Sequence, residues 1–303
     1  MSTALNFLPI FLSLILIEYV VGRFKGRSLY SRTESGLSIG IALGQQLIRY
    51  LGLSLRAAML FLLWEFKLFE LPKDNIGYWV ALFFSVEFTY YWFHRMSHEV
   101  RWFWANHSVH HSIEEMNILA AIRFGWTGWI SGAFIFHAPL AIIGFHPVHI
   151  ALMLGLNLAY QSWIHTTLIG KLPLIEGILN TPSAHRVHHA SNADYLDRNH
   201  GGVTMIFDRV FGTYVEERED TPVEFGLVKP APSKNIFRVT LNEWIRMVAD
   251  LRSSPIKHWP GYLFGPPGWA PDGQGITSKD LRDQYRLEHP NQVSPVKLDQ
   301  SYT

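Results

Sequence analysis

The chain has 303 residues, enough for one large domain or two small ones. Hydrophobic residues make up 48% of it and charged residues only 17%, a balance shifted from soluble toward membrane proteins. The formal net charge of +1 gives no indication of nucleic-acid binding. Because the chain contains no cysteine, disulfides, cysteine-ligated zinc and iron–sulfur clusters are excluded, and histidine and carboxylate remain as metal ligands.

The first part of the chain contains long apolar segments. Residues 4–21 are long enough to span a bilayer, and they lack the flanking features of a cleaved signal peptide. Basic residues follow between 23 and 32, so the positive-inside rule places this loop in the cytoplasm. Segment 37–64 is mostly apolar but carries two glutamines and two arginines. It is therefore either one tilted span or a broken or interfacial helix.

Three further segments complete the predicted membrane part. Residues 76–93 form a clear span with Tyr and Trp near its ends. Segments 126–144 and 148–168 predict a helical hairpin, because only a short turn separates them. From about residue 170 onward no apolar run is long enough to cross a bilayer. We therefore expect an all-α integral membrane protein with about four to five membrane-embedded helices and a cytoplasmic histidine-rich metal domain.

The C-terminal part differs in composition from the rest. We expect residues 1–220 to form the membrane-embedded domain with the metal site, and residues 221–303 to form a cytoplasmic extension. Apolar residues recur at steps of three and four over 236–252, which predicts an amphipathic helix packed on the core or on the membrane surface. The last dozen or so residues are expected to be a loose tail.

Nine of the fifteen histidines are clustered in short motifs. HRMSH follows the apolar segment 76–93 and places two imidazoles at positions i and i+4, which share one helix face with Cβ atoms about 5–6 Å apart. HSVHH and HRVHH each place three imidazoles at i, i+3 and i+4, an arrangement expected to gather them on one stripe. The motif QSWIH adds one more histidine. The nine residues are His94, His98, His107, His110, His111, His165, His185, His188 and His189.

This clustering predicts a metal site with two ions. Neutral imidazole is a good ligand for iron, and nine exceed the needs of one ion. Shared between two ions, they supply about four or five nitrogens to each and leave room for oxygen. A structural zinc needs only four ligands, so the number of histidines favours catalysis. Glu99, Asp194, Asp197 and Asn199 are candidate acceptors for the second ring nitrogen of the ligands.

The remaining isolated histidines are interpreted differently. A lone histidine is more often a packed core or surface residue than a ligand. This interpretation applies to His137, His146, His149, His258 and His289.

The membrane topology supports a shared site. If 126–144 and 148–168 cross the bilayer out and back, the histidines before and after the hairpin meet on one side. The basic loop at 23–32 makes that side the cytoplasm. The sequence therefore predicts a multi-pass membrane protein, in the inner membrane if the chain is bacterial, with its metal site on the cytoplasmic side.

The histidine motifs and their preceding membrane segments resemble the fatty acid hydroxylase and sterol desaturase superfamily. Within it, EFTYYWFHRMSHE, YQSWIHT, NTPSAHRVHH and DRNHGGVTMIFDRVFGTYVEE are most similar to the branch of the alkylglycerol monooxygenases and their bacterial relatives. The resemblance covers roughly residues 5–218. It implies metal-ligand roles for the HxxxH and HxxHH histidines, matches His165 to a further family histidine, and matches Glu99 to a catalytically important acidic residue. It also implies iron as the metal and tetrahydrobiopterin as a candidate electron donor.

Residues and resemblance together predict a membrane-bound non-haem di-iron monooxygenase. It would use O2 to oxidise a C–H bond of a lipid from the bilayer, such as an ether lipid, a sterol or a fatty acyl chain. Hydroxylation is favoured, and a desaturase with the same site is the alternative. No GxGxxG motif indicates a built-in nucleotide domain, so a separate reductase or a reduced pterin must supply electrons.

Two other classes remain as alternatives. A metal-ion or proton transporter would hold its ligands near the bilayer midplane, whereas these histidines lie at and beyond the ends of the apolar segments. A haem-binding membrane protein would need only single histidines that face each other from two spans.

Overall fold

The computed structural model describes residues 2–231 and 233–290, and the expected loose tail lies outside them. This part is helical and contains no β-strand, which confirms the all-α prediction. The α-helices are α1 (Ser2–Phe24), α2 (Arg32–Trp64), α3 (Ile76–Glu99), α4 (Arg101–His111), α5 (Ala138–Ile143), α6 (Pro147–Ile164), α7 (Pro182–His188), α8 (Ile206–Val210), α9 (Ile236–Ser253), α10 (Trp259–Phe264) and α11 (Ser278–Glu288). Short 3-10 helices are η1 (Ile118–Ile122), η2 (Ala133–His137), η3 (Ala193–Tyr195), η4 (Ile256–His258) and η5 (Pro271–Gly273).

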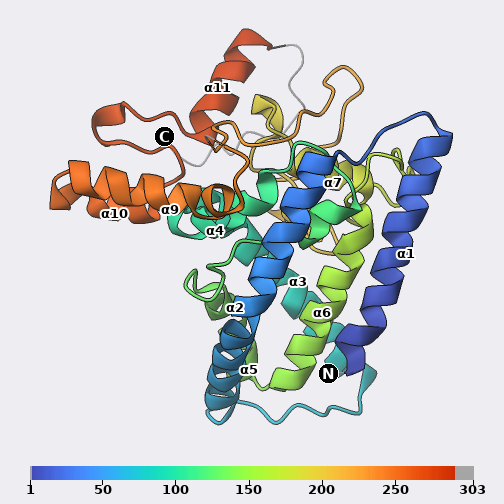
Figure 1. Cartoon of the computed structure of the whole chain (residues 1–303). Coiled ribbons are helices and arrows are strands. Elements are labelled where there is room, and N and C mark those ends of the chain that lie inside the picture. The colour runs from blue at the N-terminus through green and yellow to red at the C-terminus, as the bar shows by residue number, and fades with distance from the viewer. Residues whose placement is uncertain (1, 232, 291–303) are drawn as a thin grey trace.

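The four long helices α1, α2, α3 and α6 form a bundle, and the other helices gather mainly at one of its ends (Figure 1). There α9 and α10 run crosswise to the bundle (Figure 1). At the opposite end, buried side chains of α2, α3, α5 and α6 form one hydrophobic cluster. Its buried members are Leu60, Tyr78, Leu82, Val86, Leu140, Ala141, Phe145 and Ile150.

Polar caps define where the helices begin. The Ser31 side chain accepts a hydrogen bond from the backbone N–H of Glu34 at the start of α2, and Asn75 caps α3 in the same way. Segment 37–64, expected as one tilted span or a broken helix, lies within α2, which bends by 42° between Tyr50 and Gly52.

The expectation of one continuous helix over 126–144 was wrong. Residues 126–132 form turns, η2 follows, and only the six residues of α5 are α-helical. Gly132 adopts the left-handed conformation with a φ of 76°, so a right-handed helix cannot continue through this residue. The segment nevertheless runs between the two ends of the bundle: Thr127 contacts Asn106 of α4, whereas Phe145 packs on Tyr78 at the start of α3.

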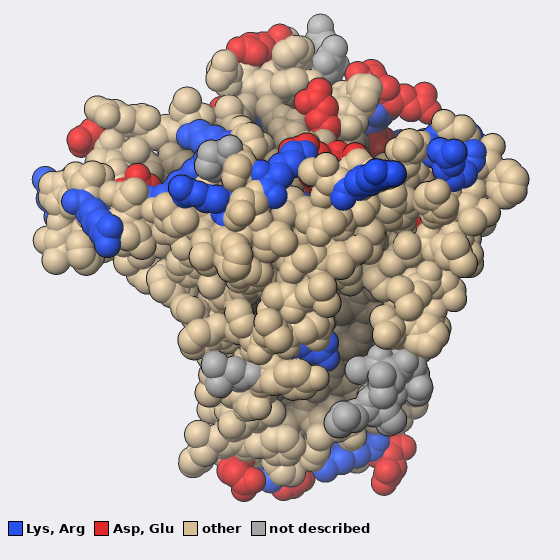
Figure 2. Space-filling model, viewed as in Figure 1, with Lys and Arg blue, Asp and Glu red and all other residues tan. Residues whose placement is uncertain are grey.

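None of the helices in the described ranges is, taken singly, both long and apolar enough to meet the criteria for a membrane span. The two halves of α2, Arg32–Tyr50 and Gly52–Trp64, meet them only together. On the face in view, Figure 2 shows a broad surface over the bundle that carries few charged side chains. A band of Lys and Arg crosses the molecule at one edge of this surface, and further charges gather at the far end (Figure 2).

Candidate metal centre

The fold brings all nine clustered histidines together in two adjacent groups. Within each group, one ring nitrogen from every member lies within 4.8 Å of those of the others. The two groups touch, because the stacked rings of His111 and His189 have centroids 4.4 Å apart. The first group is His94, His98, His107, His111 and His188, and the second is His110, His165, His185 and His189.

Each motif is positioned by its helix. Val100 is extended, with φ −118° and ψ 119°, and this break between α3 and α4 turns the chain so that HSVHH faces HRMSH. His165 follows the last residue of α6. HRVHH lies on α7 and its C-cap, where Thr181 caps the helix and Pro182 occupies the first turn.

Both HxxHH motifs divide their histidines between the two groups. The members at i and i+4 share one group, whereas the member at i+3 belongs to the other. The expectation that each triplet forms one stripe was therefore too simple. Positions i+3 and i+4 differ by about 100° around a helix, so neighbouring histidines point to different centres.

Backbone carbonyls fix the orientation of three ligand candidates. His94, His165 and His188 contact carbonyl oxygens through Nδ1 at 2.7–2.9 Å. A carbonyl can only accept, so Nδ1 carries the proton of the neutral ring and Nε2 presents its lone pair to the group. The acceptors belong to His200, Gln161 and Arg198, respectively.

A carboxylate orients a fourth candidate. Asp197 Oδ1 lies 3.4 Å from Nδ1 of His98, as the sequence suggested for one of its acidic residues. The other candidates do not contact a ligand side chain. Asp194 pairs with Arg218, and Asn199 bonds the backbone carbonyl of Ala184 in α7 and the backbone of Val215.

The donor set fits metal ions. Ring nitrogens approach one another closely, for example His94 and His107 at 3.0 Å and His165 and His185 at 2.9 Å between their Nε2 atoms. Nε2 of His98 and of His188 finds no hydrogen-bond partner in the described chain, although both rings are buried. Converging, unpaired lone pairs of this kind are costly without a cation between them.

Burial also keeps six of the clustered imidazoles neutral. Burial lowers the pKa of each of these rings well below 6.5, and the neighbouring histidines lower this pKa further. Neutral imidazole is the form that binds a metal ion. The histidines with this depressed pKa include His107, His110, His111, His185, His188 and His189.

A tenth histidine, His200, lies against the first group and was not singled out from the sequence. Its ring is fully buried, 5.1 Å from that of His98 between centroids, and neither ring nitrogen has a partner in the described part of the chain. Its backbone carbonyl accepts from His94, and its N–H donates to Asp208 at 2.7 Å. Its position shortly after HRVHH, in RNHGG, is the only sequence signal that indicates it.

The histidines interpreted as packed core or surface residues lie outside both groups. His137 contacts the Thr89 hydroxyl through Nδ1 at 2.9 Å, and His149 contacts the Tyr78 hydroxyl at the opposite end of the bundle. Glu99, which the resemblance matches to a catalytically important acidic residue, forms an ion pair with Arg95 at 2.8 Å and lines neither of the two cavities described below.

An apolar cavity of about 590 Å³ reaches both groups from the bundle side. Its walls come mainly from α1 and α6. Leu8, Phe11 and Leu14 face a row of small residues on α6. At its inner end lie His94, His107, His110 and His165.

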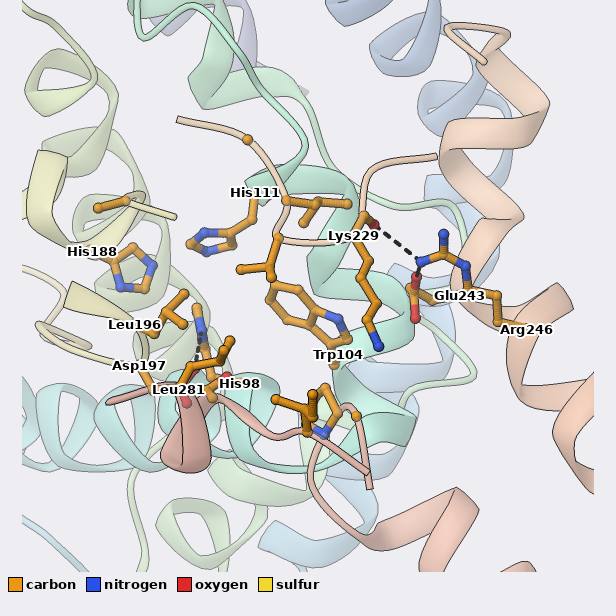
Figure 3. Close-up of a pocket in the computed structure, with 18 residues that line it drawn as sticks. His98, Trp104, His111, His188, Leu196, Asp197, Lys229, Glu243, Arg246 and Leu281 are labelled. Carbon is orange, nitrogen blue, oxygen red and sulfur yellow. Dashed lines mark hydrogen bonds and ion pairs between the residues drawn. The ribbon is translucent and has the colours of Figure 1, made fainter. Parts of the chain in front are cut away.

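A smaller cavity of about 130 Å³ reaches the first group from the charged end. Figure 3 shows His98, His111 and His188 on one side of it and Lys229, Glu243 and Arg246 on the other. The C-terminal segment supplies much of its outer wall, including Leu281 of α11. The metal candidates are thus reached by two routes, an apolar one from the bundle side and a smaller one that carries charged side chains.

Buried histidines arranged in two groups at one end of a helical bundle define the class as a histidine-rich metalloprotein. Residues 79–213, which include all nine histidines, match the sequence model of the family described as "Fatty acid hydroxylase". These residues therefore constitute a fatty acid hydroxylase domain, and the resemblance inferred from the motifs is confirmed.

Individual relatives agree with this assignment. The chain is 36% identical to the alkylglycerol monooxygenase of Homo sapiens over 312 residues, which cover 97% of the chain and 66% of that protein. It is 36% identical to the alkylglycerol monooxygenase of Xenopus tropicalis, over 86% of the chain and 58% of that protein. The ornithine lipid hydroxylase OlsE of Rhizobium tropici is 25% identical over 46% of the chain and 43% of that protein. No solved structure matches the chain.

The chain spans only part of these relatives. It covers 58–66% of the length of the vertebrate alkylglycerol monooxygenases that it matches.

Proposed function

We propose that this protein is a membrane-bound, iron-dependent monooxygenase that hydroxylates a C–H bond of a lipid. The observation that carries this proposal is the position of the two histidine groups at the inner end of an apolar cavity. The family match and the relatives, which are named alkylglycerol monooxygenases and an ornithine lipid hydroxylase, support it.

Two iron ions fit the donor set. The first group offers five ring nitrogens and the second four, so each ion would keep room for a non-protein ligand. Iron bound there would supply the capacity to activate O2 for attack on an unactivated C–H bond. The backbone contacts of Nδ1 aim the Nε2 atoms of His94, His165 and His188 into the two groups. We retain Glu99 as a proposed catalytic residue on the family resemblance alone.

The apolar cavity is suited to a lipid chain. Its volume lies within the range of about 300–1,000 Å³ that is usual for ligand pockets. Ala151, Gly155 and Ala159 follow one another at steps of four along α6, so one helix face leaves space for a chain. The apolar walls exclude water and direct the end of the chain toward His110 and His165.

We infer that the protein is a multi-pass membrane protein with its metal centre at the cytoplasmic face. Arg27, in the basic loop after α1, donates to the carbonyl of Thr167 just beyond His165, so this loop lies at the end that holds the metal candidates. The positive-inside rule then favours the cytoplasm for that end. Leu68 and Ile142 are hydrogen-bonded at the opposite end, where α2 and α5 finish.

Hydroxylation requires a donor of electrons. One oxygen atom of O2 enters the lipid and the other leaves as water, which consumes two electrons and two protons. We propose a separate donor, either a reductase or a reduced pterin such as tetrahydrobiopterin. The smaller cavity supports access from the charged side, because it reaches His98, His111 and His188 without passing through the lipid cavity.

A turnover assay tests this function. Iron-loaded protein is incubated with lipid extract and O2, with a reduced pterin in one arm and a ferredoxin or cytochrome reductase system in the other. Zinc-loaded protein serves as the control. The proposal expects an oxidised lipid only with iron, O2 and a reductant together. Turnover without O2 would contradict it.

A further inference from the structure

The C-terminal helices expose an apolar face to the outside of the molecule. In α9, Phe237 is 63% exposed, and Ile245 and Val248 are exposed as well. Beyond α9, Ile256 is 75% and Phe264 is 60% exposed. These helices run crosswise to the bundle, so their exposed side chains are not part of its lateral surface (Figure 1).

The apolar residues of α9 lie on two separate faces. Val239 and Met247 are buried, and α9 packs against α4. At 100° per residue, Phe237, Ile245 and Val248 fall within an arc of about 80° on a different side. The described segments leave most of this second face open. Trp126 contacts the ring of Phe237 edge-on and Leu241 is half-buried, but Phe237, Ile245 and Val248 stay exposed.

Cations flank the uncovered face. Arg238 and Arg252 extend from α9, and Lys257 follows in η4. None of these three forms an ion pair with a carboxylate in the described ranges. They are part of a segment that lies near the band of Lys and Arg at the edge of the surface with few charged side chains (Figure 2).

We propose that α9 and α10 bind the surface of a bilayer that contains anionic phospholipid. The apolar arc enters the boundary between headgroups and acyl chains, and the three cations contact lipid phosphates. Amphipathic helices with large apolar side chains and flanking basic residues bind membranes in this way. Each Lys or Arg near an anionic surface contributes about 1 kcal/mol. This interaction goes beyond the proposed oxidation and does not depend on it.

The surface contact would also support the metal centre. α4 carries three ligand candidates, and α9 holds it through the ion pair of Arg101 with Asp250 at 2.5 Å. Trp244 of α9 donates to the Thr127 hydroxyl at 2.9 Å and packs edge-on against Trp102 of α4. A bilayer that holds α9 in place therefore restrains α4.

The test uses single-cysteine variants of the full chain, which has no native cysteine. Spin labels are attached at Val248→Cys and Ile256→Cys, with the exposed Lys279→Cys on α11 as the matched polar control. The proteins are placed in nanodiscs with and without phosphatidylserine. Collision of each label with O2, which concentrates in lipid, is compared with collision with a water-soluble nickel chelate.

We expect the labels at 248 and 256 to favour O2 and the label at 279 to favour nickel. We also expect the O2 preference at 248 and 256 to fall in neutral discs and in the triple variant Arg238→Gln, Arg252→Gln, Lys257→Gln. Metal content verifies that the triple variant folds. Nickel preference at all three sites would overturn the proposal, as would an identical result in neutral and anionic discs. Labels shielded from both reagents would show that a protein covers the face instead.

Because the readout needs no turnover, it separates the two proposals. A protein that shows this labelling pattern but oxidises no lipid contradicts the proposed function and leaves the surface interaction standing.

Discussion

Asp197 joins the C-terminal extension to the metal centre through His98. Its Oδ1 lies 3.4 Å from Nδ1 of His98, and its Oδ2 accepts a hydrogen bond from Arg282 of α11 at 2.9 Å. Burial by itself would raise the pKa of Asp197, but the hydrogen bonds and charges of His98 and Arg282 lower it below its usual value. Asp197 is therefore a carboxylate that fixes the tautomer of His98, so that Nε2 faces the first group.

Asp197→Asn should weaken iron binding without unfolding the protein. Removal of a carboxylate behind a metal-binding histidine typically lowers metal affinity by about 10–100-fold. Titration against a competing chelator measures the change, and Asp283→Asn, on the exposed side of α11, is the matched control. Equal affinity in wild type and Asp197→Asn would show that this carboxylate does not orient a ligand.

Iron-loaded protein should contain about two ions per chain and show no haem Soret band, since nine imidazoles exceed the needs of one ion. His188→Ala and His110→Ala each remove one member of a different group, so each should lower metal content and abolish turnover. His137→Ala should keep its metal, because that ring contacts Thr89 and neither group. A single tightly held zinc, with no activity after iron loading, would refute the two-ion site.

Gly155→Phe should shorten the lipid chain that the protein accepts. An added Cβ at Gly155 meets no atom within 4 Å, so the larger side chain fits the fold and fills the cavity instead. Gly155 precedes His165 by ten residues, or about 15 Å along α6. Long-chain substrates should lose kcat/KM more than short-chain ones, measured over a series of chain lengths. Gly36→Phe, at an equally open site outside the cavity, is the control. An unchanged chain-length profile would exclude the cavity as the lipid site.

Cysteines introduced at Lys25, Glu114 and Glu219 should all react with a membrane-impermeant reagent from the cytoplasmic side, and one at Lys73 should react only from the other. The first three lie at the end of the bundle that holds the histidine groups, and Lys73 belongs to the opposite α2–α3 loop. Labelling of right-side-out and inverted vesicles measures this. Opposite sides for Glu114 and Glu219 would be incompatible with this topology.

The spacing of the histidines was sufficient to find the site, because three short motifs concentrate eight imidazoles on short stretches of helix. It could not predict how the nine divide into two groups. That division depends on the angle between α3, α4 and α7, which Val100 and the loop before Thr181 set. His200 was missed for the same reason, since only tertiary structure brings a lone histidine against His98.

Hydropathy predicted the helices less well where turns interrupt an apolar segment. Segment 126–144 has the composition of a span, but Gly132 and the packing of Trp126 decide its shape. The Trp126 indole donates to the carbonyl of Ile41 at 2.9 Å. It also packs so closely on Gly44 that a side chain at that position would clash with it. Such tertiary contacts override a helical preference that composition alone suggests.

Turnover under 18O2 tests the central claim most directly. Iron-loaded protein is supplied with lipid extract and a reductant, and the products are analysed by mass spectrometry. Our account predicts one 18O atom in a lipid alcohol, or in an aldehyde derived from it, and the second in water. An unlabelled alkene formed together with labelled water would indicate a desaturase, and product formation without O2 would contradict the oxygenase altogether.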